Sequence, residues 1–148
     1  MAKISAPDLT QHPPRSPRVR LGGYAHLPRL LDKARAFAAR KHGEYNYNCP
    51  LDEMFFEFAG IGHKAFLAAV KTGKSDTEML AWVDARSKRL PMEIVQWSSW
   101  IESRCPGSAE AHGRFQAGIT KLAPERTDIT TFFERLDLDD YVSFGGRG

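Results

Sequence analysis

The chain has 148 residues, of which 42% are hydrophobic, 11% aromatic and 26% charged, and these values are ordinary for a globular domain. They exclude a disordered, a collagen-like and a disulfide-dense protein. The longest apolar run, residues 65–70, is far shorter than the ~20 residues of a membrane-spanning helix. Because no apolar segment follows Lys3 as it would in a signal peptide, we expect one soluble domain in the cytoplasm, without a membrane partner.

The net charge of +3 is unevenly distributed along the chain. Residues 1–41 hold nine Lys and Arg against two Asp, which gives +7, and the remaining residues hold 12 basic and 16 acidic groups, which gives −4. A basic N-terminal third can bind nucleic acid or an acidic protein. It can equally pair with the acidic groups of the same chain, and we favour this second interpretation.

Residues 1–23 are predicted to form an extended arm. Four of the nine prolines fall in this segment and disfavour helix, and a pair of glycines ends it with a turn. Three apolar side chains, Leu9, Val19 and Leu21, are expected to dock the arm on the rest of the protein. Its arginines are expected to meet acidic side chains of the later helices.

Residues 24–144 are predicted to form a helical domain, and the glycine-rich residues 145–148 are expected to fray. Apolar side chains recur at helical spacing, and Pro, Gly, Ser and Thr mark the helix ends. The predicted helices cover about residues 28–42, 50–60, 63–72, 76–88, 92–104 and 108–122, with a short one near 132–136 before an acidic turn at 137–140. The predicted fold class is all-α: a compact single-domain bundle of about six to seven helices with an extended, Pro- and Arg-rich N-terminal arm.

Three segments make the chain resemble a bacterial family known as domain of unknown function 5069. They read RSPRVRLGGYAHLPRLLDKARA (15–36), GEYNYNCPLD (43–52) and FFEFAGI (55–61), with weaker agreement around residues 75–83. The resemblance spans nearly the whole chain and implies a single domain. It brings no activity, cofactor or assigned catalytic residue.

Cys49 is the most distinctive single residue, and it is the candidate catalytic residue. It is predicted to cap the helix that begins at Pro50, where the positive end of the helix dipole favours a thiolate, while Asp52 and Glu53 in the first turn oppose that effect. An acid–base partner could come from His26, Tyr24 or Lys33 if the first helix lies alongside. A small thiol that only packs explains the sequence as well. Whether the protein is an enzyme is left open.

The segment from residue 24 to residue 52 concentrates aromatic hydroxyls, opposite charges and one thiol. We expect these groups to bind a small, anionic molecule between the arm, the first helix and residues 45–52. The candidate ligand-binding residues are Tyr24, Arg29, Lys33, Tyr45, Cys49 and Asp52. No metal-ligand spacing and no nucleotide-binding motif is present, so neither a metal nor a cofactor is expected. The alternative function is a nucleic-acid or acidic-protein binding module that uses the basic N-terminal third.

Overall fold

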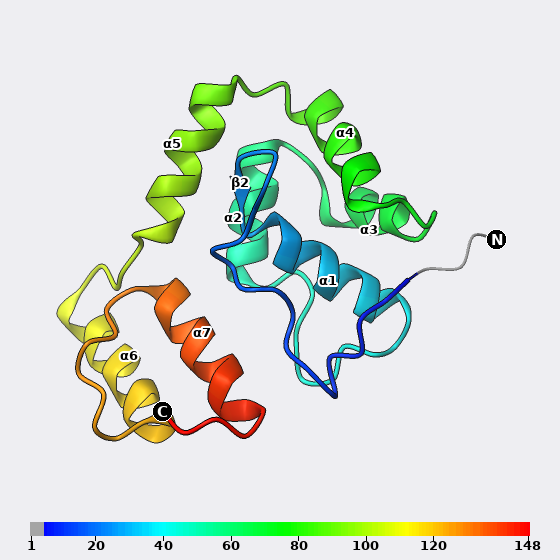
Figure 1. Cartoon of the computed structure of the whole chain (residues 1–148). Helices are drawn as coiled ribbons and strands as arrows, with labels where there is room; N and C mark the ends of the chain where they lie inside the picture. Colours follow the sequence, from blue (N-terminus) through cyan, green and yellow to red (C-terminus); the bar gives the residue numbers. More distant parts are fainter. Residues whose placement is uncertain (1–4) are drawn as a thin grey trace.

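The computed structural model describes residues 5–148 and contains, within that range, seven helices and one two-stranded hairpin (Figure 1). The strands are β1 (Arg20–Leu21) and β2 (Tyr24–Ala25). The helices are α1 (Leu27–Ala38), α2 (Pro50–Ala59), α3 (His63–Val70), α4 (Asp76–Ser87), α5 (Pro91–Glu102), α6 (Ala109–Leu122) and α7 (Phe132–Ser143). The predicted all-α bundle is therefore confirmed. None of the helices in this part of the chain has the length and apolar character needed to cross a membrane.

The last helix is longer than the sequence pattern predicts. The acidic turn expected at residues 137–140 is part of α7, which continues to Ser143. Asp is a weak helix former, but tertiary contacts override propensity when they stabilise the helical conformation. Here Asp137 accepts a bond from Arg18 (3.0 Å) and Asp140 accepts one from Arg29 (2.7 Å). These ion pairs stabilise the helical conformation of Asp137 and Asp140.

Helix α1 lies at the centre of the molecule (Figure 1). Nine of its 12 residues are buried, and three of these are charged: Arg29, Asp32 and Lys33. Burying a charge is costly unless it is paired and hydrogen-bonded. The elements packed around α1 must therefore supply counter-charges, and this requirement shapes the site described below.

The hairpin before α1 was not expected from the sequence, which indicates only a turn there. Arg20 pairs with Ala25 and Leu21 with Tyr24 in antiparallel register, and the two turn glycines both have positive φ. Such a turn matches the twist of the flanking strands and favours glycine. Ser98 of α5 accepts a bond from Ala25 N–H (2.9 Å) and donates to the Gly23 carbonyl (2.8 Å). The hairpin thus ties α5 to the start of α1.

The described part of the N-terminal arm, residues 5–19, follows the surface of the helices, and residues 1–4 lie outside the described residues. Leu9 is 2% exposed, and its N–H donates to the Lys41 carbonyl (2.8 Å). Leu21 packs against the main core. Val19 does not anchor the arm, because it lies in a turn closed by its bond to Ser16 and is 42% exposed.

Two apolar clusters hold the helices together. The larger one joins the hairpin with α1 to α5, and the smaller one lies between α6 and α7, which stand side by side in Figure 1. Phe133 of α7 belongs to the larger cluster and stacks on His26 at 6.1 Å between ring centroids. After α7 the chain turns back, and Gly146 N–H donates to the Tyr141 carbonyl (2.8 Å). Helix α7 therefore contacts both clusters and reaches the start of α1.

Candidate functional site

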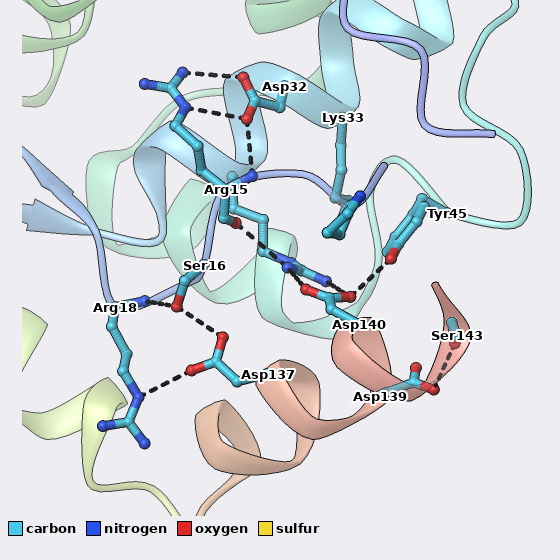
Figure 2. A network of polar contacts seen from close by, with 12 residues as sticks. Arg15, Ser16, Arg18, Asp32, Lys33, Tyr45, Asp137, Asp139, Asp140 and Ser143 are labelled. Atoms are coloured by element: carbon cyan, nitrogen blue, oxygen red, sulfur yellow. Dashed lines mark hydrogen bonds and ion pairs between the residues drawn. The ribbon is translucent and has the colours of Figure 1, made fainter. Parts of the chain in front are cut away.

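Arg29 on α1 is paired with Asp140 on α7. Its guanidinium donates to both carboxylate oxygens, at 2.7 and 3.3 Å, and both side chains are almost fully buried. Tyr45 also donates its hydroxyl to Asp140, at 2.7 Å (Figure 2). Burial, followed by the hydrogen bond to Asp140, raises the pKa of Tyr45 above its ordinary range. Tyr45 therefore stays a neutral donor, and the three side chains link α1, the following loop and α7.

A second group of side chains surrounds Asp52, which is completely buried at the start of α2. We call His26, Lys33, Cys49 and Asp52 the Asp52 cluster. The Asp52 carboxylate accepts bonds from His26 Nε2 (2.7 Å) and Lys33 Nζ (2.8 Å), and from the backbone N–H groups of Asn48 (2.9 Å) and Cys49 (3.2 Å). Lys33 Nζ also donates to Cys49 Sγ, at 3.2 Å. A single buried carboxylate thus positions a histidine, a lysine and a thiol.

The protonation states of His26 and Asp52 follow from their surroundings. Burial raises the pKa of Asp52, but the bond from His26 and the charge of Lys33 outweigh burial and hold the pKa at about 2. Burial lowers the pKa of His26, so the ring is neutral at pH 7. Because a carboxylate can only accept, the Nε2 atom of His26 carries the proton and Nδ1 is an acceptor. This buried Nδ1 atom has no hydrogen-bond partner among the described residues.

A cavity of about 190 Å³ brings the two groups of side chains together. Its walls include His26, Arg29 and Lys33 near the start of α1, Tyr45 and Cys49 from the following loop, and Leu136 and Asp139 from α7. A second cavity of about 430 Å³ shares Glu44, Tyr45 and Asp139 with it. Glu44 and Asp139 are exposed, whereas His26, Arg29 and Lys33 are buried. The inner cavity is therefore a polar recess reached through an acidic mouth.

The structure places four of the six predicted site residues on the wall of this cavity, namely Arg29, Lys33, Tyr45 and Cys49. Asp52 lies behind the wall and holds His26 and Lys33 in place. Tyr24 does not line the cavity. As part of β2 it points into the main core, where its ring packs on Phe55 and its hydroxyl bonds Ser87 (2.8 Å).

Sequence reasoning missed the contribution of α7, which closes one side of the cavity. Leu136, Asp139 and Asp140 lie on this helix, and nothing in their local pattern indicates a contact with α1. The available signal was the acidic character of residues 137–140, which complements the basic N-terminal third. From the described part of the arm, Leu9 and Thr10 line the second cavity, and the Arg15 carbonyl accepts a bond from Arg29 (3.3 Å).

Most basic side chains of the N-terminal third are paired within the chain. Arg15 bonds Asp32 (3.0 Å) and Asp76 (2.8 Å), as Figure 2 shows for Asp32. The other ion pairs of this segment are Arg18–Asp137, Arg20–Glu102, Arg29–Asp140, Lys33–Asp52 and Arg35–Asp76. The positive charges of the N-terminal third are therefore largely paired with acidic side chains of the same chain.

The fold and the site define a small helical protein with a recess, lined largely by polar side chains, at the meeting point of α1, α2 and α7. Residues 11–142 match the family model described as Domain of unknown function (DUF5069), and the chain belongs to this family. The matched range includes both the Asp52 cluster and Asp140. No curated protein matches the chain. Within residues 5–148, no three His, Cys, Asp or Glu side chains are arranged to hold a metal ion.

Proposed function

We propose that the protein binds a small organic acid that also carries a hydrogen-bond donor, such as a hydroxy acid or an amino acid, in the recess between α1, α2 and α7. The observation that carries this proposal is the unpartnered, buried Nδ1 atom of His26, a residue that belongs to the cavity wall. Buried polar atoms almost always have a partner, and leaving one without costs about 1–3 kcal/mol. A hydroxyl or ammonium group of a ligand supplies the missing donor.

The acid group of the ligand is expected to meet Lys33. An ammonium group has three N–H donors, and Lys33 uses one on Asp52 and one on Cys49, so one remains for a ligand. Glu44 and Asp139 at the mouth disfavour a ligand with negative charge alone. Glu44 and Asp139 favour a ligand whose second group is a hydrogen-bond donor. His26 Nδ1 is the acceptor for such a group.

The size of the recess limits the ligand. Sites for drug-sized molecules occupy roughly 300–1,000 Å³, whereas the inner cavity has about 190 Å³. The inner cavity therefore suits the acid and donor groups of a compact molecule, and any longer chain extends toward the adjoining cavity. Both cysteines are free thiols, which supports action in the reducing cytoplasm.

Matched pairs of small acids test this proposal. We expect glycolate, lactate and glycine to raise the melting temperature in a concentration-dependent way, because a ligand that binds only the folded state stabilises it. Acetate and propionate lack the donor and are expected to have a much weaker effect. Equal effects from both sets, or none from either, would contradict the proposal.

A tyrosine pair provides the matched variants for the same assay. Tyr45 lines the cavity and Tyr24 does not, although both are partly or fully buried and hydrogen-bonded. Tyr45→Phe is expected to weaken the stabilisation by the acids, and Tyr24→Phe to leave it unchanged.

The alternative function, binding of nucleic acid or an acidic protein, has less support because the basic segment is largely paired within the chain. Salt-dependent binding of labelled nucleic acid would favour it.

A further inference from the structure

We infer that Cys49 and Lys33 are an oxidation site, at which a peroxide converts the thiol and amine into a covalent sulfur–nitrogen link. The two reacting atoms, Cys49 Sγ and Lys33 Nζ, are 3.2 Å apart. This inference does not depend on the ligand proposed above, because it concerns only side chains of the protein itself and a small oxidant.

The surroundings hold both atoms in position to react. Lys33 is 4% exposed, and its ammonium is fixed by the buried Asp52 carboxylate at 2.8 Å. Cys49 is fixed by its place at the start of α2 and by its backbone bond to the same carboxylate. Reacting atoms held at about 3–3.5 Å gain a large rate advantage, because no encounter is needed.

The thiol is also accessible. Cys49 is half-buried and lines the cavity, which is large enough to admit hydrogen peroxide. The sulfur is the nucleophile in such reactions, and the Lys33 ammonium donates to it at 3.2 Å. Cys105 is even more exposed, but within residues 5–148 its sulfur has no hydrogen-bonded amine beside it.

The first step forms a sulfenic acid. Cys49 sulfur attacks one peroxide oxygen, a sulfur–oxygen bond forms, the oxygen–oxygen bond breaks and the leaving hydroxide takes the thiol proton as water. Sulfur is oxidised by two electrons, and the peroxide is reduced by the same two.

The second step forms the link without further oxidation. Lys33 releases one proton to solvent, and its amine attacks the Cys49 sulfur. A sulfur–nitrogen bond forms as the sulfur–oxygen bond breaks, and the hydroxide that leaves takes a second proton from nitrogen. The link removes the positive charge of Lys33 from Asp52. A thiol reductant cleaves the link by attack on the sulfur and restores both side chains.

Mass spectrometry of the wild-type protein tests the inference directly. The folded chain is treated briefly with hydrogen peroxide and then digested. We expect the peptides that contain Cys49 and Lys33 to be linked, with a mass two hydrogen atoms below the sum of the two separate peptides. Dithiothreitol should return it to the reduced pair. Cys105 serves as the internal control, and we expect it to form no link to a lysine. Oxidation of Cys49 that stops at sulfenic or sulfinic acid, with no linked peptide, would overturn the inference.

Two variants separate the role of the amine from that of charge. Lys33→Arg keeps the charge beside Cys49 but replaces the amine by a weakly nucleophilic guanidinium, so the linked peptide is expected to disappear while Cys49 is still oxidised. Cys105→Ser should link as the wild type does. A linked peptide that persists in Lys33→Arg through another lysine would contradict the assignment. The wild-type experiment decides the question even if Lys33→Arg fails to fold.

Discussion

Asp140 pairs with Arg29 across 111 positions of sequence, at 2.7 Å between carboxylate and guanidinium. The pair joins the first helix to the last, and Tyr45 adds a third element by donating to the same carboxylate. Since both charges are buried, neither can be left alone without a large cost. The contact therefore holds α7 against α1 and closes one wall of the recess.

Asp140→Asn removes the charge from this pair while keeping the shape of the side chain. We expect a loss of about 3–5 kcal/mol in the free energy of unfolding, because Arg29 is left as a buried, uncompensated charge. Urea unfolding measures it. Glu110→Gln, which removes the partner of Arg114 in an exposed pair, is the control and should leave stability nearly unchanged. Similar effects from the two variants would contradict the role assigned to Asp140.

Stability is expected to fall as the pH drops below about 6.5. Burial lowers the pKa of His26 from its ordinary 6.5, so the unfolded chain binds a proton in a range where the folded chain does not. The unfolded state then binds more protons, and acid favours it. Asp52 acts in the same direction at lower pH, because its pKa falls from 3.8 to about 2 on folding and its stabilising contribution is lost through that interval.

Urea unfolding between pH 7.5 and 5 measures the histidine contribution. His26→Gln should show a weaker dependence on pH in this range, whereas the exposed His12 provides a control, since His12→Gln should keep the wild-type slope. If the free energy of unfolding depends on pH equally in the wild type and both variants, His26 does not cause the loss of stability in acid.

Leu9→Ala tests how firmly the N-terminal arm is attached. Leu9 is buried, and truncation of a buried leucine costs about 2–5 kcal/mol. Val19→Ala is the control, because Val19 is exposed and its truncation should change stability by less than about 0.5 kcal/mol. Thermal or urea unfolding of the two variants gives the comparison. An unchanged melting curve for Leu9→Ala would show that the arm adds nothing to stability.

Two glycine substitutions are expected to act in opposite directions. Gly22 has a φ of 58°, and a Cβ there would collide with Leu80, so Gly22→Ala should destabilise the protein by more than about 1 kcal/mol. Gly113 lies inside α6, and a Cβ there would meet no atom outside its own helix within 4 Å, so Gly113→Ala should stabilise by about 0.4–1 kcal/mol. Urea unfolding measures both. Destabilisation by both substitutions would contradict the open surroundings of Gly113.

The helices could be predicted because their signals are local. Ser75 and Glu78 have the spacing of a capping box, and the structure shows both reciprocal bonds, at 2.8 and 3.2 Å. Cys49 likewise caps α2 as expected. Before α7 the sequence offers Asp128 or Thr130 as the cap, whereas Thr131 forms it. Neighbouring polar residues offer the same hydroxyl or carboxylate, so the sequence alone does not separate them.

The composition of the site could be predicted only in part. Arg29, Lys33 and Cys49 lie close in sequence to one another, and a helix followed by a short loop brings them together. Asp140 could not be assigned, because its contact depends on how α7 folds back. Tyr24 was misplaced because its hydroxyl suggests a polar site, whereas strand pairing turns its ring into the core.

The position of α7 at the far end of the chain has a consequence for synthesis on the ribosome. Arg29 leaves the ribosome well before Asp140, and until α7 emerges its charge has no buried counter-charge to meet. Contacts that span so much sequence form late in folding, because a long loop must close first. The recess is therefore the last part of the protein to assemble, and a nascent chain that stops before α7 lacks one of its walls.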